Sequence, residues 1–269
     1  MRKIAFIGVG NMASAIIGGM LRSGAVDHAH LILSDRFPDK CDAYVQGGAT
    51  LAATPADAAR EADCVVLSVK PQNFPEILPE LAEVESIQDK LIITIAAGIS
   101  SDTVKAALRG APVVRVLPNT PMLIGQGVSV VCRANVTAED FDFVVSVFEA
   151  SGRVTVIDES DMNRIISVTS SSPAYVFAFI GAIYEGARAQ GLDGNDLITT
   201  ICDVVIGSAE LLKSGNLTPE EQIKMVTSKG GTTEQAMRVL SERDLTGTVV
   251  DAMKACTARA EEMDRASHG

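Results

Sequence analysis

A glycine-containing turn near the start of the chain has the residue types that bind the phosphates of a dinucleotide. The apolar run Lys3 to Ile7 ends in Gly8-Val9-Gly10-Asn11-Met12-Ala13 and continues into a helical pattern, which indicates a strand, a tight turn and a helix. The first glycine can adopt backbone angles closed to other residues, the second lets a pyrophosphate approach the main chain, and the alanine lets the helix pack closely on its strand. Because a helix N-terminus favours negative charge, no lysine is required there. The predicted coenzyme contacts of this turn are Gly8, Gly10, Asn11, Met12 and Ala13.

The next strand pattern, Leu31 to Arg36, ends where the adenosine ribose of such a coenzyme would lie. Asp35 is suited to accept hydrogen bonds from the ribose 2′-hydroxyl, which favours NAD. Ser34 and Arg36 are suited to hold the 2′-phosphate of NADP instead. The two signals conflict, so the sequence leaves the choice between NAD and NADP open. A solvated Asp-Arg pair in a loop is a third interpretation.

Two polar segments in the second half of the chain have the composition of helix starts that bind a carboxylate. In the first, Val168 to Tyr175, we expect Ser172 to be an N-cap and Pro173 the first helical residue, although an ordinary cap explains the pattern equally well. The second, Met225 to Glu234, places two glycines among four hydroxyl side chains, which is more than a cap requires. Exposed N–H groups and hydroxyls at such a helix start can hold an anion locally. The predicted carboxylate-binding residues are Ser228, Gly231, Thr232 and Thr233.

Charge, cysteines and histidines exclude several classes of function. The chain of 269 residues is 47% hydrophobic and carries a net charge of -11 without a cluster of Lys and Arg, which argues against a nucleic-acid partner. Its five cysteines are scattered and never in C-x-x-C spacing, so we interpret them as buried free thiols and predict neither a disulfide framework nor a metal site. His28, His30 and His268 fall in a loop and at the C-terminus, where none is well placed for catalysis.

Strand and helix patterns alternate through the first half of the chain, which indicates an α/β fold. The apolar run at 64–69 is continuous, as expected for a parallel strand covered on both faces, and further strand patterns follow at 91–95 and 113–117. Each run ends in a small, proline-bearing or polar loop. Because ligands of an open α/β sheet lie beyond the carboxyl ends of its strands, we expect these loops to line the nicotinamide side of a cleft. The predicted coenzyme contacts in them are Val69, Lys70, Pro71, Ala96, Ala97, Gly98 and Asn119.

From about Asp161 onward the chain is predicted to be helical, which marks a change of domain. The apolar block Ala174 to Tyr184 is too short to span a bilayer, so we expect a buried helix and no membrane contact. Apolar residues within 198–212 indicate a buried subunit interface, or else packing within the domain itself. The first residues mimic a signal peptide, but glycines interrupt the apolar run, so we expect a cytoplasmic protein.

Together these motifs resemble those of the pyrroline-5-carboxylate reductase family, and the likeness covers almost the whole chain in order. The segments that carry it are the glycine turn, Val69-Lys70-Pro71-Gln72, Ala96-Ala97-Gly98, Pro118-Asn119-Thr120-Pro121, Ser171-Ser172-Pro173-Ala174-Tyr175 and Gly230-Gly231-Thr232-Thr233. The resemblance implies a Rossmann-type dinucleotide-binding domain over residues 1–160 and an all-α dimerisation domain over residues 161–269. It also implies an interlocked homodimer, or a higher homo-oligomer built from such dimers.

The resemblance further implies a reaction in which NADPH or NADH donates a hydride to the cyclic imine 1-pyrroline-5-carboxylate, giving L-proline. Imine reduction needs no histidine, because a protonated imine is already electrophilic once the two carbons are held close together. From the family, we expect Thr233 to hydrogen-bond the ring nitrogen. We expect Ser228 and the main-chain amides of residues 231–233 to hold the carboxylate. Because Thr232 is adjacent, the sequence does not distinguish which of the two threonines takes which role.

Two positions depart from the family pattern, since Ser170 stands where glycine is usual and Lys229 where proline is usual. Lys229 either supplies a positive charge for the substrate carboxylate or points into water. The departures keep two alternatives open. One is a related cyclic-imine or β-hydroxyacid reductase, and the other is a catalytically silent NAD(P)-binding paralogue with a regulatory role.

Overall fold

The computed structural model of the chain describes residues 1–132, 134, 136–215 and 217–267. His268 therefore lies outside the described residues. The chain forms two compact units, one made of residues 1–173 and 255–269 and the other of residues 174–254. The domain boundary predicted between residues 160 and 161 stays a prediction.

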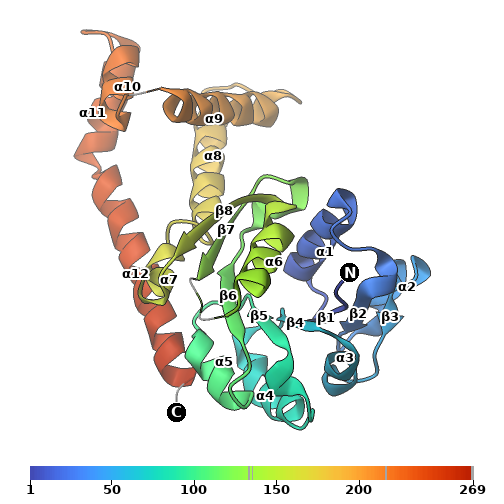
Figure 1. Ribbon diagram of the computed structural model, residues 1–269. Helices are drawn as coiled ribbons and strands as arrows, with labels where there is room; N and C mark the ends of the chain where they lie inside the picture. The colour runs from blue at the N-terminus through green and yellow to red at the C-terminus, as the bar shows by residue number, and fades with distance from the viewer. Residues whose placement is uncertain (133, 135, 216, 268–269) are drawn as a thin grey trace. The chain divides into compact units, whose positions relative to one another are not determined.

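The first unit contains a sheet and the helices between its strands (Figure 1). The strands are β1 (Ile4–Ile7), β2 (Leu31–Ser34), β3 (Thr50–Leu51), β4 (Cys64–Leu67), β5 (Leu91–Thr94), β6 (Val113–Leu117), β7 (Gly127–Cys132) and β8 (Gly152–Ile157). The helices of this unit are α1 (Asn11–Ser23), α2 (Asp42–Gln46), α3 (Pro55–Glu61), α4 (Phe74–Ala82), α5 (Ser101–Ala107), α6 (Ala138–Glu149) and α7 (Glu159–Ile165). Short 3-10 turns are η1 (His28–His30), η2 (Pro38–Cys41), η3 (Pro71–Asn73), η4 (Ile87–Asp89) and η5 (Thr120–Ile124).

The second unit is helical. It contains α9 (Leu197–Ser214), α10 (Pro219–Val226) and α11 (Thr232–Glu242). Two further helices, α8 (Ser172–Ala189) and α12 (Leu245–Ser267), begin in one unit and end in the other. The described part of the chain after β8 has no strand, which confirms the predicted change to helix.

The strand order of the eight-stranded sheet is β3-β2-β1-β4-β5-β6-β7-β8. Neighbouring strands are parallel, with Ile4 beside both Leu31 and Cys64, except for β6 and β7, which are antiparallel. The direction of β7 follows from the short connection through η5, because a parallel return needs a crossover of about a dozen residues or more.

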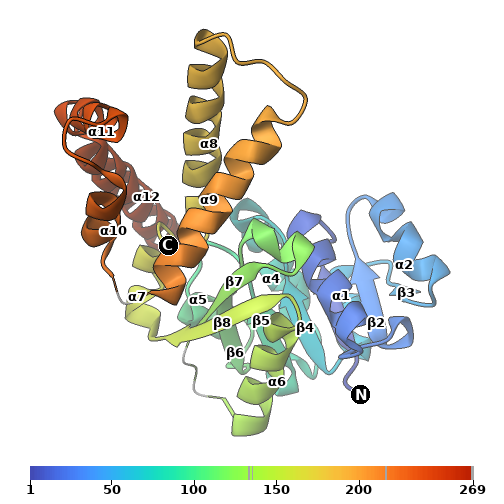
Figure 2. The ribbon, with the colours of Figure 1, turned by 90° about the horizontal axis from the view of Figure 1, so that it is seen from above.

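Helices cover both faces of the sheet. Successive strand side chains point to opposite faces, so Ile4 and Phe6 pack in one cluster with residues of α1 and α6. Ala5 and Ile7 pack in the other cluster with residues of α3, α4 and α5. Figure 1 and Figure 2 show the strands between these helices. Every residue of β4 is buried, which confirms the prediction that this strand is covered on both faces, and β1 and β5 are buried throughout as well.

The C-terminal part of α12 packs on the first unit. Ala260 belongs to a small apolar cluster with Leu117 of β6 and Met162 of α7. The loop after β5 also touches this helix, because Gly98 has a φ of +68° and a Cβ there would lie 2.6 Å from Cβ of Met263. A glycine is therefore required at this position for packing as well as for backbone conformation.

The apolar block of α8 is exposed in the single chain, so the prediction of a buried helix is wrong. No residue of α8 is buried, and Phe177 is 64% exposed. In α9, Val204 and Ile206 are exposed as well, which favours the subunit-interface interpretation of this helix. Apolar helix faces that the chain leaves uncovered require another protein surface. Within the described ranges, no helix is both long and apolar enough to cross a membrane.

Candidate functional site

The glycine turn joins β1 to α1 as predicted. Gly8 has a φ of +92°, and its N–H donates to the carbonyl of Ser34 at 2.7 Å. A Cβ on Gly8 would lie 2.9 Å from Cγ1 of Val69, so a larger residue would not fit. Gly10 is the N-cap of α1, and a Cβ there would meet nothing within 4 Å. The predicted strand, turn and helix are confirmed, and the space beside Gly10 is open to a ligand.

The first turn of α1 is suited to an anion. It contains no acidic residue, and its N-cap makes no side-chain hydrogen bond to the free N–H groups. The helix dipole adds positive potential at the same place. Asn11 is exposed and Met12 half-buried, while Ala13 is buried beneath the turn. These features fit the size and charge of a pyrophosphate.

Ser68 supports this turn and was not among the predicted site residues. Its hydroxyl lies 2.6 Å from the carbonyl oxygen of Gly8 and 3.1 Å from that of Ile7. Because Ser68 directly follows β4, it ties the turn to the neighbouring strand. A hydroxyl residue at the end of an otherwise apolar run was the available signal.

Asp35 lies just after β2, and its carboxylate holds the glycine turn. One oxygen accepts the N–H of Val9 at 2.6 Å. The other accepts the N–H of Phe37 at 2.9 Å and lies 3.3 Å from Nζ of Lys40. Burial raises the pKa of Asp35, but the two main-chain N–H groups and the Lys40 ammonium outweigh burial and leave this pKa below its usual value.

The lowered pKa of Asp35 predicts a pH-dependent contribution to stability. Because the folded pKa lies below the unfolded one, this contribution is complete above about pH 4 and is lost as the pH falls through the folded pKa. We expect the difference in unfolding free energy between wild type and Asp35→Asn to be present at neutral pH and to shrink in acid. Urea unfolding of both proteins across this range measures the difference. If the difference in unfolding free energy stayed constant down to about pH 2, the pKa of Asp35 would not be lowered by folding.

The other two residues predicted at the ribose have different surroundings. Ser34 is buried, and its carbonyl accepts the Gly8 N–H. Arg36 is exposed, and its guanidinium lies 2.9 Å from the carboxylate of Glu76 on α4. The structure therefore brings Ser34, Asp35 and Arg36 to the strand end beside the turn, as expected. Their contact with a coenzyme stays a prediction.

The loops after β4 and β5 lie at the same edge of the sheet as the turn, because β1, β4 and β5 are parallel neighbours. Val69 contacts the turn, whereas Lys70 is exposed. Pro71 opens η3. In the next loop Ala96 is buried and Ala97 half-buried, and both precede the glycine that touches α12. The structure brings these loops together as predicted, and their role in coenzyme binding stays a prediction.

Asn119 follows β6, and its side chain joins loops of the protein itself. Its Nδ2 donates to the carbonyl of Thr169 at 3.1 Å, and its Oδ1 accepts the N–H of Val128 at 2.8 Å. Ser170, one of the two departures from the family pattern, has its hydroxyl 3.5 Å from the carbonyl of Pro118. A direct contact of Asn119 with a coenzyme stays a prediction.

The predicted carboxylate-binding loop belongs to the second unit and opens α11. Its N-cap, Gly231, donates its N–H to the carbonyl of Ser228 at 3.0 Å, so this amide is occupied. Within the described part of the chain, the amides and hydroxyls of Thr232 and Thr233 have no hydrogen-bond partner. Two amides and two hydroxyls thus remain for an anion, with the exposed Ser228 beside them.

Two neighbours complete this loop. Gly230 has a φ of +75° and donates its N–H to the carboxylate of Glu234 at 2.8 Å. Lys229 is exposed and forms no ion pair with the described residues. Both expectations for Lys229, a charge for the substrate or a solvated side chain, stay open.

The other predicted helix start, before α8, is built differently. The helix begins at Ser172 itself, and its hydroxyl lies 2.5 Å from the carbonyl of Val168 and 3.2 Å from that of Ser167. The prediction of Ser172 as the N-cap is wrong, because the residue lies inside the first turn and its hydroxyl serves the preceding carbonyls.

A buried polar cluster was not predicted. Arg115 of β6 is 1% exposed, with Nη1 2.8 Å from a carboxylate oxygen of Glu159 and Nη2 2.8 Å from Oδ1 of Asn163. Asn163 in turn donates to Asp264 of α12 at 2.9 Å. Burial raises the pKa of Glu159, but the Cys132 thiol and Arg115 outweigh it and lower this pKa. The cluster attaches α7 and the end of α12 to the sheet.

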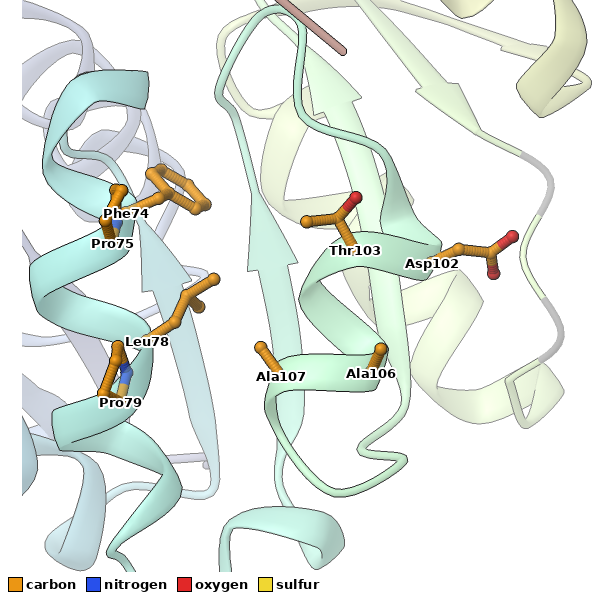
Figure 3. Close-up of a pocket in the computed structure, with 8 residues that line it drawn as sticks. All are labelled: Phe74, Pro75, Leu78, Pro79, Asp102, Thr103, Ala106 and Ala107. Carbon is orange, nitrogen blue, oxygen red and sulfur yellow. The ribbon is translucent and has the colours of Figure 1, made fainter. Parts of the chain in front are cut away.

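A hollow of about 620 Å³ lies between α4 and α5 (Figure 3). Phe74 and Leu78 line it from α4, and Ala106 and Ala107 line it from α5. Its walls are mostly apolar. No residue predicted to bind coenzyme or substrate lines this hollow, so it is separate from the candidate site.

Two family models match the chain. Residues 159–263 match a model described as pyrroline-5-carboxylate reductase dimerisation. Residues 3–98 match a model described as NADP oxidoreductase, coenzyme F420-dependent. The two ranges include the loop at residues 228–233 and the glycine turn, and they confirm the predicted Rossmann-type domain followed by an all-α dimerisation domain.

Full-length relatives show the same arrangement. Over 267 residues, the chain is 35% identical to the pyrroline-5-carboxylate reductase of Escherichia coli. The matched region covers 98% of this chain and 99% of that protein. A solved pyrroline-5-carboxylate reductase from Coxiella burnetii is 30% identical, with a TM-score of 0.85 and coverage of 97% of this chain and 98% of that one. A Plasmodium falciparum pyrroline carboxylate reductase with NADP bound has a TM-score of 0.90 at 24% identity and covers 98% of both chains, a likeness of fold.

Proposed function

The chain belongs to the pyrroline-5-carboxylate reductase family, and on this premise we propose how its residues reduce 1-pyrroline-5-carboxylate to L-proline in proline biosynthesis. The observation that carries this function is the likeness to the Escherichia coli enzyme over 98% of the chain. This likeness spans both the glycine turn and the loop at residues 228–233. A bound reduced nicotinamide coenzyme, NADPH or NADH, supplies the hydride.

The residues of the first unit fit such a coenzyme. The open space at Gly10 and the uncapped, acid-free first turn of α1 match a pyrophosphate in size and charge. The residues that would hold the pyrophosphate are Gly8, Gly10, Asn11, Met12 and Ala13. The residues that would surround the ribose are Ser34, Asp35 and Arg36, and those on the nicotinamide side are Val69, Lys70, Pro71, Ala96, Ala97, Gly98 and Asn119.

The loop that opens α11 would bind the substrate. The free amides of Thr232 and Thr233 and the hydroxyl of Ser228 would hold the carboxylate, because a helix N-terminus stabilises an anion. The amide of Gly231 already donates to Ser228, so its part is to shape the turn. The Thr233 hydroxyl oxygen would accept a hydrogen bond from the N–H of the protonated imine and so keep this electrophilic form oriented.

A homo-oligomer follows from the dimerisation model matched by residues 159–263, and we propose a homodimer or a larger assembly of dimers. The exposed apolar residues of α8 and α9 supply the surface for it. Burial of such residues against a second copy is favourable by roughly 25 cal/mol per Å² of apolar surface. A cytoplasmic location stays a prediction from the sequence.

Gly10→Ala is expected to weaken coenzyme binding by about tenfold, or ~1.4 kcal/mol, without loss of stability. Residue 10 has a φ of -88° and a ψ of -174°, which any residue adopts, and a Cβ there meets no protein atom within 4 Å. The added methyl group would instead occupy the space proposed for the pyrophosphate. Titration calorimetry with NADP⁺ measures affinity, and urea unfolding measures stability. Gly194→Ala, at an equally open glycine, is the control, and unchanged affinity of Gly10→Ala would count against the site.

The proposed function is tested by oxidation of NADPH or NADH with 1-pyrroline-5-carboxylate, alongside a panel of other cyclic imines and β-hydroxy acids. Turnover with 1-pyrroline-5-carboxylate as the best substrate supports the proposal. Preference for another imine or for a hydroxy acid would identify the related reductase. Coenzyme binding without turnover of any compound would identify the silent regulatory paralogue, and would direct attention to Ser170 and Lys229.

A further inference from the structure

The loop between β5 and α5, residues 95–100, lies against the C-terminal part of α12. Gly98 has a φ of +68°, and a Cβ there would lie 2.6 Å from Cβ of Met263 and 3.2 Å from the carbonyl oxygen of Ala260. Ala260 is buried, and Met263 is half-buried. Because Gly98 has no side chain, its main chain can touch this turn of α12. The position of the turn therefore limits where the main chain of the loop can lie.

A second contact holds the other end of the loop. Ser101, the first residue of α5, donates its hydroxyl to one carboxylate oxygen of Glu159 at 2.9 Å, and its N–H lies 3.5 Å from the other oxygen. The same carboxylate accepts a hydrogen bond from the buried guanidinium of Arg115 at 2.8 Å. A carboxylate paired with a buried arginine has little freedom to move, so Glu159 keeps Ser101 in place.

The two contacts belong to one hydrogen-bonded cluster. Arg115 also donates to Asn163 at 2.8 Å, and Asn163 donates to Asp264 at 2.9 Å. Asp264 directly follows Met263 on α12. The cluster therefore fixes both the turn of α12 that touches the loop and the carboxylate that holds the end of the loop. Connected polar groups of this kind make a buried region rigid.

The loop itself cannot adapt to a ligand by turning side chains. Its central residues, Ala96, Ala97 and Gly98, carry only methyl groups or a hydrogen, so none of them has a rotamer to change. The position of the main chain alone decides whether they meet a nicotinamide ring. Because a misplacement of about 1 Å can slow a reaction about 100-fold, the supports of this loop affect hydride transfer.

We propose that Met263 and, through Glu159, Ser101 are positioning residues for the nicotinamide end of the coenzyme. They hold the loop at residues 95–100 where its main chain meets the ring, and they touch neither coenzyme nor substrate. This inference rests on the proposed function, because the role of the loop at the nicotinamide is taken from it. It gives the end of α12 a part in coenzyme binding beyond stabilising the fold.

Titration calorimetry of the full-length protein with two ligands tests the inference without any turnover. One ligand is NADP⁺, and the other is 2′-phospho-ADP-ribose, which has the same phosphates and riboses but no nicotinamide. Met263→Ala should weaken NADP⁺ binding about 3- to 10-fold, as for one lost hydrogen bond, and change binding of the nicotinamide-free ligand less than about twofold. Met263→Leu has nearly the same side-chain volume and should retain most of the affinity for NADP⁺.

Ser101→Ala is the second variant, because it removes the hydroxyl that Glu159 holds and leaves the ion pair with Arg115 in place. It should fold normally and show the same selective loss of NADP⁺ binding. Glu261→Ala is the matched control, since Glu261 is an exposed residue of the same part of α12, and both affinities should stay unchanged. Amide hydrogen exchange of the coenzyme-free protein measures the loop itself. Residues 95–100 should exchange about threefold faster or more in Met263→Ala, because local opening becomes easier.

Equal weakening of both ligands in Met263→Ala and Ser101→Ala would indicate general destabilisation and overturn the inference. Unchanged exchange of residues 95–100 in Met263→Ala would overturn it as well, and so would faster exchange without any loss of NADP⁺ affinity. Turnover of 1-pyrroline-5-carboxylate by wild type, together with any of these results, refutes the inference alone. A wild-type protein that binds neither ligand refutes the proposed function and the inference with it.

Discussion

Arg115→Ala is expected to lower the free energy of unfolding by about 3–5 kcal/mol, the usual effect of removing one partner of a buried ion pair. Arg115 is 1% exposed, whereas Glu159 opposite it is 33% exposed. Without the guanidinium, the Glu159 carboxylate loses its cation and Asn163 loses a donor at 2.8 Å. The alanine also leaves a cavity between β6 and α7.

Urea unfolding at matched protein concentrations measures this loss, because an oligomer's stability depends on concentration. Arg153→Ala is the control, since Arg153 is an exposed arginine on β8 and should change stability by less than about 0.5 kcal/mol. Equal effects of the two substitutions would show that the buried cluster does not hold α7 and α12 to the sheet.

Thr233→Ala is expected to lower kcat/KM for 1-pyrroline-5-carboxylate about 10- to 150-fold, which corresponds to ~1.5–3 kcal/mol. The hydroxyl of Thr233 has no partner among the described residues, so it is available to the imine nitrogen. Thr233→Ser retains a hydroxyl and should recover most of the activity. Affinity for NADP⁺, measured by titration, should not change.

Thr232→Ala is the matched control for this prediction, because it removes a neighbouring hydroxyl from the same helix start. A large loss in Thr232→Ala with little loss in Thr233→Ala would exchange the two roles. A change of less than about twofold in both variants would exclude either hydroxyl from the transition state, since a hydrogen bond to a charged group contributes more.

The features of the coenzyme side that depend on local geometry were predictable from the sequence. The sequence predicted that Gly8 adopts backbone angles closed to other residues, and its φ of +92° confirms this. Ser100 and Thr137 precede α5 and α6, and the hydroxyl of each accepts an N–H three residues later at 3.1 Å. Such requirements act over a few residues, so the order of residue types is enough to reveal them.

Contacts between distant residues were decided by the tertiary structure. Asp35 and Val9 are 26 residues apart, and Arg115 and Glu159 are 44 apart. The sequence showed an acid at the end of a strand and an arginine inside an apolar run. Which group each one meets depends on strand order and register, and neither is present in a local pattern.

Burial of the C-terminal helices was decided in the same way. The apolar composition of α8 showed that its side chains must be covered, and this led to the prediction of a buried helix. The chain leaves them exposed, with Phe177 at 64%. The hydrophobic effect favours removing apolar surface from water, regardless of which chain supplies the cover. The residue types therefore determined that the apolar faces of these helices must be covered by another surface. The tertiary structure determined that this surface is not supplied by the chain itself, because the chain leaves these faces exposed.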